Sequence, residues 1–485
     1  MTASPPAKTA LVWLRRDLRL TDNPAIELAR THADHLVFAY VHAPDEEAPW
    51  EPGAASRWWL HHSLVSLQRD LDARGQRLII RRGPSLTALR TLIAETGAQT
   101  VTWNRLYEPA TIARDKAVKA GLQEDGRTAE SCNGALLFEP WEIRTDQGSP
   151  YRVFTPFWKR CMKTLADVGS PAPVPELGPA PPAGVASETL ESLALLPRMP
   201  WDGGFKQAWQ PGEGGAHALV DVLADSIVAR YGDTRNRPDL VGTSRLSPHL
   251  HFGEISPRQI VAALAPAGHE AASAAGTEAY IRELGWREFA HHLLFHFPAT
   301  PTTPLDLKFA DYRWENSPAL LKAWQRGQTG YPLVDAGLRE LWHTGWMHNR
   351  VRMIVASLLV KNCQTHWLEG ARWFWDTLVD ADLANNTSGW QWTAGCGADA
   401  APYYRIFNPV LQSERFDPDC RYLRQWIPEL KALPDKWLRR PWEAPAEVLR
   451  AAGVELGRTY PRPVVDLRES RDQALAGYAD LKRPN

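Results

Sequence analysis

With 485 residues, 44% of them hydrophobic and 23% charged, the chain has the composition of a globular protein and is long enough for two or three domains. No hydrophobic stretch reaches membrane-spanning length, and the N-terminus lacks the apolar core of a signal peptide, so we expect no membrane association. The formal net charge of −1 gives no overall attraction to nucleic acid, and a polyanionic partner would have to bind a local basic patch.

Short apolar runs alternate with helical patterns over about the first 130 residues. This alternation is typical of an α/β domain with a parallel, doubly wound, Rossmann-like sheet and helices on both faces. Neither GxGxxG nor GxxxxGK[ST] occurs, so we expect no ordinary NAD or ATP site in this domain. The predicted strands are 9–14, 36–42, 77–81 and 99–103, and the predicted helices lie near 23–31, 57–74, 85–97 and 109–122.

The second half of the chain has a helical pattern almost throughout, which predicts a large all-α domain over 206–485. Residues 136–205 contain the Pro-rich stretch SPAPVPELGPAPPAGVAS (170–187) and are predicted to be a linker. The α/β domain then covers 1–135. The helices are predicted at 216–231, 256–264, 277–296, 317–326, 333–343, 346–361 and 367–379, and within the stretch 373–409.

The cysteines and histidines show no spacing typical of a metal site. The five cysteines are scattered, odd in number and without a CxxC pair, which favours a reducing compartment. Histidines such as His249, His251, His291 and His292 lack carboxylates or cysteines at ligand spacing, so we interpret them as structural. We therefore expect a cytoplasmic protein without a metal ion. Hydrolytic chemistry has no support either, because a nucleophile elbow and an HExxH motif are absent from the sequence.

The stretch 373–409 mixes acids, amides, small residues and aromatics in a way that a purely structural helix does not need. If the stretch is helical, Asp382, Asn386 and Trp390 share one face because they are spaced i, i+4 and i+8. Residues 385–389 (NNTSG) have low helix propensity, so tertiary contacts or a bound ligand would have to hold them. We expect the chemistry of the protein here.

Two further segments carry side chains suited to a ligand. Residues 243–247 (TSRLS) precede a predicted helix and could hold a diphosphate at its N-terminus, or could simply cap the helix beside a solvated arginine. Glu283, Trp286 and Arg287 form one helical patch. That patch is either a ligand surface or an exposed ion pair beside a packed indole.

The segment GWMHNRVRM, which starts at residue 345, has a similar character. Asn349, Arg352 and Met353 share a helical face by their i, i+3 and i+4 spacing. An amide, a guanidinium and a thioether suit a flat, partly charged ligand. From the residues alone, a basic helix end is the alternative.

Together these segments resemble the photolyase/cryptochrome flavoprotein family, and the resemblance covers nearly the whole chain. Six motifs that occur in the family's order are far more specific than any one of them. The resemblance implies an N-terminal antenna domain followed by a helical FAD- and DNA-binding catalytic domain. The motifs are WLRRDLRLTDNP from residue 13, TSRLS from 243, WREF from 286, GYP from 330 with Asp335 and Ala336, GWMHNR from 345, and the stretch 382–409.

Within the family, the chain looks most like class I photolyases that act on cyclobutane pyrimidine dimers. In those enzymes the dimer is flipped out of UV-damaged DNA and split by electron transfer from photoexcited reduced FAD. Asn349 and Met353 match positions that meet the lesion, and Asn386 matches the residue facing the central flavin nitrogen, where many plant cryptochromes carry an acid. Because an amide cannot deliver a proton as a carboxylic acid can, Asn386 favours repair over signalling. A cryptochrome-like blue-light photoreceptor, a (6-4) photolyase and a flavin-dependent redox enzyme remain as alternatives.

The resemblance implies three sets of site residues. The catalytic set joins an electron relay with residues around the flavin and lesion, and Trp392 is expected to be structural. The FAD-binding set is Tyr231, Thr243, Ser244, Arg245, Leu246, Ser247, Arg352, Asp380, Ala381, Asp382 and Asn386. The DNA- or lesion-binding set is Arg235, Glu283, Trp286, Arg287, Asn349, Arg350 and Gln412. The catalytic set is Trp390, Trp367, Trp314, Asn386, Glu283 and Met353.

The antenna region is residues 103–108 (WNRLYE), where the match to folate-binding relatives is partial. Glu108 fits their pattern, but Tyr107 stands where an amide is expected. A methenyltetrahydrofolate antenna is therefore favoured over a deazaflavin, and an empty antenna site is the third alternative. We expect a monomer that needs no protein partner, with UV-damaged DNA as its ligand.

Overall fold

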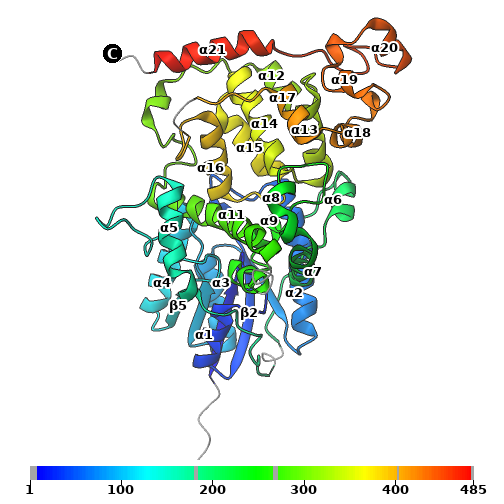
Figure 1. The fold of residues 1–485 in the computed structure, drawn as a ribbon. Coiled ribbons are helices and arrows are strands. Elements are labelled where there is room, and N and C mark those ends of the chain that lie inside the picture. Colours follow the sequence, from blue (N-terminus) through cyan, green and yellow to red (C-terminus); the bar gives the residue numbers. More distant parts are fainter. Residues whose placement is uncertain (1–7, 180–183, 266–270, 401–403, 482–485) are drawn as a thin grey trace, which may run out of the picture.

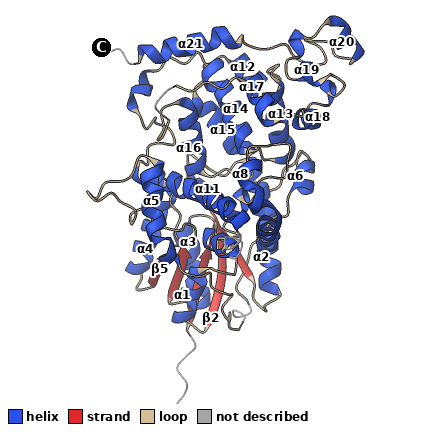
Figure 2. Cartoon of the chain, in the orientation of Figure 1, coloured by secondary structure: helices blue, strands red, loops and turns tan. Residues whose placement is uncertain are grey.

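The computed structural model describes residues 8–179, 184–265, 271–400 and 404–481. A sheet with its helices forms one end of the molecule, and a larger helical body forms the other (Figures 1 and 2). The predicted fold class, an α/β domain followed by a helical domain, is therefore confirmed. The Pro-rich stretch and the stretch 382–409 include residues 180–183 and 401–403, which lie outside the described residues.

The sheet is parallel, with the strand order β3-β2-β1-β4-β5. Four strands coincide closely with the apolar runs that predict them. The fifth, β5, is not predicted by the sequence because it is a polar strand at the sheet edge in which only Ala129 is buried. The strands are β1 (Thr9–Leu14), β2 (His35–His42), β3 (Leu78–Arg82), β4 (Thr100–Asn104) and β5 (Thr128–Cys132).

Helices cover both faces of the sheet, as the doubly wound pattern predicts. Alternate residues of β1 supply two separate cores, Val12 and Leu14 to one and Leu11 and Trp13 to the other. The first core lies under α1 (Pro24–His32) and α2 (Ala54–Asp72), and the second lies under α3 (Ser85–Thr96) and α4 (Pro109–Glu124).

The part from residue 203 onward is helical, as predicted. Its longest helix, α11, lies at the centre of the molecule beside α16, where the helical body meets the α/β domain (Figure 1). Its α-helices are α6 (Gly203–Ala208), α7 (Glu213–Val222), α8 (Tyr231–Thr234), α9 (Ser247–His251), α10 (Pro257–Leu264), α11 (Ala271–His296), α12 (Pro318–Gln325), α13 (Pro332–Thr344), α14 (Asn349–Ser357), α15 (Trp367–Thr377), α16 (Leu383–Ala394), α17 (Pro409–Phe416), α18 (Arg421–Trp426), α19 (Asp435–Leu438), α20 (Ala446–Ala451) and α21 (Leu467–Asp480).

One helix lies inside the predicted linker. α5 (Phe154–Thr164) packs against α11, with Phe154 and Phe157 buried against Trp286 and Phe289. Because α5 contributes aromatic side chains to a shared core, this part of 136–205 belongs physically to the helical body.

Two predicted helices differ from the structure. The helix predicted over 346–361 begins at Asn349, because the Nδ1 atom of His348 accepts a hydrogen bond from the Arg350 backbone N–H (3.1 Å) and caps the helix there. The helix predicted over 216–231 is interrupted after α7 by a π-helical turn, Leu223–Ile227, and a 3-10 turn, Val228–Arg230. Hydrophobic periodicity does not distinguish these turn types, so the sequence gives no warning of them.

Polar contacts fix the helical body on the α/β domain. The indole N–H of Trp59 on α2 donates to Glu254 (3.0 Å), and that of Trp375 on α15 donates to the Glu51 carbonyl (2.7 Å). A Cβ atom added to Gly53 would lie 2.3 Å from the backbone oxygen of Trp375, so only glycine fits this close approach. α15, which forms part of the site below, is thereby held directly against the α/β domain.

Candidate functional site

A cavity of about 470 Å³ opens between α11, α14, α15 and α16. Its size is in the range of small-molecule and cofactor sites. Tyr231, residues 243–247, Trp367, Trp314 and Gln412 are not among the side chains that line it. The predicted site residues that do line it are Arg235, Glu283, Trp286, Arg287, Asn349, Arg350, Arg352, Met353, Asp380, Ala381, Asp382, Asn386 and Trp390.

The helix α16 forms one wall of the cavity, and its start is fixed by Asp382. The Asp382 Oδ1 atom accepts hydrogen bonds from the backbone N–H and the side-chain amide of Asn385, both at 2.8 Å. This N-cap satisfies a backbone N–H in the first turn of the helix. It thereby stabilises a helix whose residues 385–389 have low helix propensity. At the other side of the helix, a Cβ added to Gly370 on α15 would lie 2.0 Å from the Trp390 ring. Close packing against α15 therefore holds this helix.

Asn386 has a fixed orientation at the cavity wall. Its amide nitrogen donates to the Ala371 carbonyl on α15 (3.0 Å). That bond uses one of the two amide N–H groups, so the other N–H and the amide oxygen remain available for hydrogen bonds at the cavity. Asp382, Asn386 and Trp390 line one cavity, as their helical spacing predicts.

A partly buried ion pair forms the next part of the wall. The Arg352 guanidinium bonds both oxygens of Asp380 (2.8 and 3.1 Å), while its Nε donates to the Met347 carbonyl (2.7 Å). Paired charges with this geometry give the cavity a fixed donor and acceptor without leaving an isolated buried charge.

The segment 243–247 lies outside the lining residues but is linked to them through aromatic side chains. The Arg245 guanidinium lies over the Trp209 and Trp346 rings (4.2 and 4.9 Å to the ring centroids). The Arg352 guanidinium also lies over the Trp346 ring, 5.9 Å from its centroid. Burial lowers the pKa of Arg245. The Ser244 and Tyr280 hydroxyls are 2.7 Å apart, which joins this segment to α11.

The opposite end of the cavity carries the residues predicted to meet DNA. Trp286 stacks on Phe154 with a centroid separation of 3.7 Å and an interplanar angle of 8°. Phe154 thus covers one face of the indole and fixes its plane, so the other face is available to a flat ligand. Sequence reasoning missed Phe154, which comes from the predicted linker.

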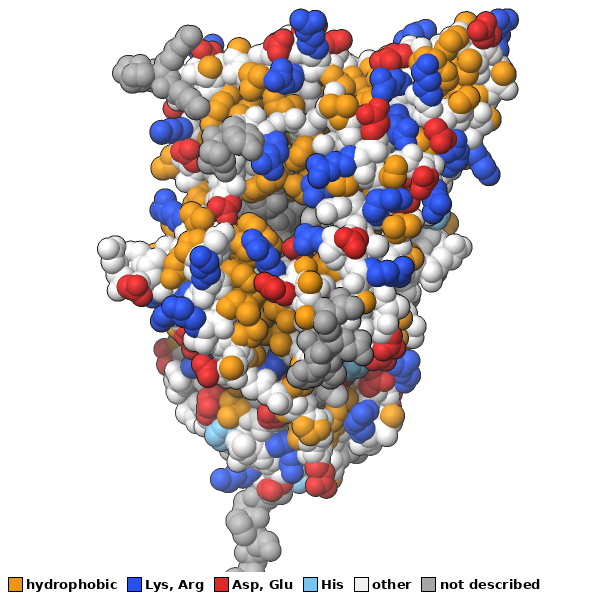
Figure 3. All heavy atoms as spheres, in the orientation of Figure 1, with side chains coloured by type: hydrophobic (Ala, Val, Ile, Leu, Met, Phe, Trp, Pro, Cys, Tyr) orange, Lys and Arg blue, Asp and Glu red, His pale blue; other side chains and the backbone are white. Residues whose placement is uncertain are grey.

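The charged side chains at this end are paired with one another. Arg235 and Glu283 form an ion pair (2.6 Å), and each side chain is about a quarter exposed. The Arg350 guanidinium donates to the Asn236 side-chain oxygen (2.7 Å) and lies near the Met353 sulfur (3.5 Å). On the face shown in Figure 3, Lys and Arg side chains are interspersed with Asp and Glu over the helical half.

The predicted relay residues are arranged around α15. Trp390 is 2% exposed and contacts Phe374 at a centroid distance of 5.0 Å. Trp367 is the first residue of α15, and the His366 ring lies between it and Trp314, at 5.6 and 5.1 Å respectively. Trp314 is only partly buried. The three indoles thus lie on the cavity wall, in the core and near the surface.

Sequence reasoning missed several lining residues. Gly389 and Thr393 follow Asn386 at i+3 and i+7, so the same helical spacing could have identified them. Phe374 and Ala356 are apolar and carry no signal apart from their place in the core. Trp392, interpreted as structural, also lines the cavity while its indole N–H donates to the Asp399 carbonyl (3.1 Å).

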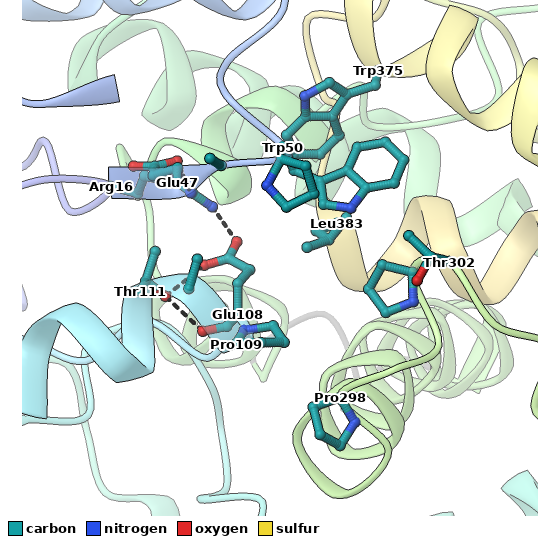
Figure 4. A pocket seen from close by; sticks show the side chains of 14 residues that line it. Arg16, Glu47, Trp50, Glu108, Pro109, Thr111, Pro298, Thr302, Trp375 and Leu383 are labelled. Carbon is teal, nitrogen blue, oxygen red and sulfur yellow. Dashed lines mark hydrogen bonds and ion pairs between the residues drawn. The ribbon is translucent and has the colours of Figure 1, made fainter. Parts of the chain in front are cut away.

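A second cavity, of about 240 Å³, lies between the two domains (Figure 4). Trp50 and Trp375 form an edge-to-face pair on one side, with centroids 5.5 Å apart. On the other side Glu108 is paired with Arg16. Burial alone would raise the pKa of Glu108, but the Arg16, His251 and His291 charges together outweigh burial, so the pKa of this carboxyl is lowered. A third cavity of about 270 Å³ adjoins it and also contains Arg16 and Trp375.

Over the described residues, no cluster of His, Cys, Asp or Glu side chains is arranged to hold a metal ion. No helix of the same residues is both long and apolar enough to cross a membrane.

Two family models match the chain. The model described as DNA photolyase matches residues 10–180, and that described as FAD binding domain of DNA photolyase matches residues 280–480. The chain is 46% identical over 479 residues to a deoxyribodipyrimidine photo-lyase of Agrobacterium fabrum, covering 98% of this chain and 99% of that protein. It is also 39% identical to Cryptochrome-1 of Arabidopsis thaliana, covering 95% of this chain and 69% of that protein.

Among solved structures, a bacterial class III photolyase from Agrobacterium tumefaciens superposes with a TM-score of 0.95 at 45% identity, and the alignment covers all of both chains. The chain therefore belongs to the DNA photolyase/cryptochrome family, and it carries that family's FAD-binding domain. The resemblance stated from the sequence motifs is confirmed at this level. The class I assignment is not confirmed, because the similar structure is titled a class III photolyase.

Proposed function

We propose that the protein is a deoxyribodipyrimidine photo-lyase that repairs cyclobutane pyrimidine dimers in UV-damaged DNA under blue light. One observation carries this proposal: a single cavity has the wall of Asp380, Asp382 and Asn386 at one end and the half-buried Trp286 face at the other. A cofactor and a flat nucleic-acid base could therefore meet within it. The naming of a 46% identical relative as a deoxyribodipyrimidine photo-lyase supports the same activity.

The residues of the cavity fit FAD. A volume of about 470 Å³, a fixed amide acceptor at Asn386 and the Arg352–Asp380 pair offer the apolar walls and few oriented polar groups that cofactor sites share. Asp382 and Asn386 would hold the ring system, and Tyr231 with residues 243–247 would bind the diphosphate end. When bound and reduced, FAD supplies the light-excited electron that splits the dimer.

The protein's own residues position the lesion. A dimer stacks and pairs poorly, so turning it out of the helix costs less than turning out normal bases. Trp286, held by Phe154, offers it a stacking face worth ~1–3 kcal/mol per base. Glu283 can hydrogen-bond the extruded bases once Arg235 leaves it for a phosphate, and Asn349, Arg350 and Met353 would complete the contact surface.

Asn386 supports repair over light signalling. Its neutral amide gives no proton to the cavity, whereas an acid in the same place could. Its hydrogen bond to Ala371 fixes the orientation of the amide at the cavity wall. The reduced cofactor would therefore remain in the form that repair needs.

The photolyase class that we propose for the protein is taken from the class of the similar solved structure. Because the full-length match at 45% identity is titled a class III photolyase, we place the protein with that group rather than with class I. The 39% identity to Cryptochrome-1 makes a blue-light photoreceptor the second candidate function.

We also propose that the cavity between the domains holds the antenna. It is lined by Glu108, which the sequence pattern associates with folate-binding relatives, and by the Trp50 and Trp375 indoles, on which a flat chromophore could stack (Figure 4). A methenyltetrahydrofolate remains favoured over a deazaflavin. Absorbance of the purified protein, with chromophore extraction, tests this assignment.

A repair assay tests the main proposal. Chemically reduced protein would be mixed separately with oligonucleotides carrying a cyclobutane dimer and a (6-4) lesion, then illuminated with blue light. Restored thymines from the dimer only are expected. Repair of the (6-4) lesion alone, or of neither lesion with FAD fully bound, would overturn the proposal, the second result in favour of a photoreceptor.

A further inference from the structure

The buried carboxylate Asp382 has two histidines against the oxygen that does not cap α16. Its Oδ2 atom lies 3.4 Å from Nε2 of His291 on α11 and 3.6 Å from Nδ1 of His251 at the end of α9. All three side chains are almost completely buried. Since Asp382 lines the large cavity and His251 lines the third cavity, this cluster stands between the two.

Hydrogen-bond geometry fixes the protonation of His291. Its Nδ1 lies 3.0 Å from the Arg287 carbonyl oxygen, and since that oxygen can only accept, Nδ1 must carry a proton. A neutral ring would then present a bare Nε2 lone pair to the Asp382 carboxylate. Two acceptors would face each other in a buried place, which is unfavourable. The contact is favourable only when Nε2 is protonated as well, which makes the ring an imidazolium ion.

The charges around this pair agree with that assignment. Burial alone would lower the pKa of His291, but the Asp382 carboxylate outweighs it and the pKa is raised. Burial alone would raise the pKa of Asp382, but the His291 and His251 charges outweigh it and hold the pKa well below its usual range. The ring pairs with this carboxylate rather than with Glu288, which bonds the Leu137 and Phe138 backbone.

The other charged neighbours have partners of their own. Arg287 donates to the Ala135 carbonyl (2.8 Å) and lies 3.5 Å from Glu288. From the α/β domain, Glu108 is paired with Arg16. Of the two rings beside Asp382, His291 is therefore the one whose contacts require a positive charge.

The neighbouring histidine on α11 shows the opposite state. The Nε2 atom of His292 accepts a hydrogen bond from the Tyr151 backbone N–H (3.1 Å), so its ring can stay neutral. Burial and the nearby His296 lower the pKa of His292 to about 3. Two adjacent buried histidines thus differ in charge because one faces a carboxylate and the other a backbone donor.

We propose that His291 is a positioning residue: as an imidazolium ion it neutralises Asp382 at the wall of the FAD cavity and so favours the reduced cofactor. This inference rests on the proposed placement of FAD. Without the ring charge, the carboxylate would face the cavity as a buried negative charge and oppose the addition of electrons there. The effect is present at low pH and is lost as the pH rises through the raised pKa of His291.

The first test uses the wild-type holoprotein with ¹⁵N-labelled histidine. At pH 7 the two ring nitrogens of His291 are expected to give the signals of an imidazolium ion, and those of His292 the signals of a neutral ring. Assignment comes from the His291→Asn and His292→Asn spectra. A neutral His291 ring at pH 7 would overturn the proposal without any need for a functional variant.

The second test measures the midpoint potential of bound FAD against pH. His291→Asn is expected to shift the FAD reduction equilibrium about tenfold toward the oxidised form near neutral pH, the size of one moderate charge interaction. The difference should narrow as the pH rises, because the wild-type ring then loses its charge too. His291→Arg, which stays charged, should restore the wild-type value, and His292→Asn should leave it unchanged.

Equal potentials in the wild type and His291→Asn at every pH would overturn the proposal. Because neither test uses DNA, a protein that repaired no dimer would leave these results standing. Failure of the wild type to bind FAD, by contrast, would remove the placement on which the inference rests and overturn it together with the proposed function.

Discussion

The two ends of the large cavity are built differently. At the α16 end, Asp382 and Trp390 are buried and Asn386 is half-buried, and the backbone or a packed helix fixes each of them. At the α11 end, Arg235 and Glu283 are partly exposed and bond to each other. A fixed wall suits a cofactor that stays bound, because nothing needs to rearrange. Paired side chains suit a ligand that comes and goes, because its charges can replace the partner each side chain already has.

The largest expected effect concerns the fixed end. Trp390→Phe should abolish light-driven reduction of oxidised FAD, since a phenyl ring is much harder to oxidise than an indole, while dimer repair by chemically reduced protein stays nearly unchanged. Absorbance of FAD under blue light and repair of a dimer oligonucleotide measure the two activities. Trp141→Phe, an indole that is 38% exposed and does not line the cavity, is the control. Loss of both activities would mean that Trp390 belongs to the repair site itself.

The next largest effect is expected at the α11 end of the cavity, where the side chains would exchange partners when DNA binds. Trp286→Ala removes the stacking face and should weaken binding of a dimer-containing oligonucleotide by about 10- to 100-fold, as ~1–3 kcal/mol per stacked base implies. FAD content should be unchanged, because the substitution lies at the other end of the cavity. Fluorescence anisotropy measures the affinity, and Trp342→Ala, an indole that is 59% exposed, is the control. Equal affinities for the two variants would argue against a lesion at Trp286.

The close packing of the α16 end can be tested by replacing two glycines with alanine. Gly370→Ala would place a Cβ 2.0 Å from the Trp390 ring and should reduce the free energy of unfolding by about 1–3 kcal/mol. Gly389→Ala on α16 meets no protein atom within 4 Å, so it should not destabilise the protein without FAD. Because Gly389 lines the cavity, that variant should instead lower FAD content. Thermal denaturation with and without FAD distinguishes a loss of stability from a loss of FAD binding. Equal melting temperatures for the two variants without FAD would contradict the close packing at Gly370.

The smallest effect is expected for the paired charges. Arg235→Gln should change the free energy of unfolding by less than about 1 kcal/mol, because the ion pair with Glu283 is partly exposed. If Arg235 turns to a phosphate when DNA binds, the slope of log affinity against log salt should decrease by about 1, for dimer and undamaged DNA alike. Arg458→Gln, from an exposed ion pair, is the control. An unchanged slope would show that Arg235 does not meet the phosphates.

Much of the cavity could be predicted from helical spacing and ordered motifs. Asp382, Asn386 and Trp390 lie on one face because of their spacing alone, and the motif at residues 286–289 identifies the Trp286 end. Phe154 could not be found in this way, because it lies in a segment that reads as a linker and contacts Trp286 only through the tertiary fold. His251 and His291 look structural for the same reason, since the carboxylate between them comes from a third helix.

An α/β domain followed by a helical domain could be predicted from the sequence, because hydrophobic periodicity is a local pattern that can be read without the tertiary structure. The sequence also determined the family, through six motifs in order. Three features follow from the tertiary structure alone: the polar edge strand β5, the α5 helix in the linker, and the two histidine rings beside Asp382. The physical reason is that burial and charge pairing depend on distances between residues far apart in the chain, whereas helix and strand patterns depend on neighbours a few residues away. The charge state of a buried side chain therefore depends on the tertiary fold and not on the local sequence.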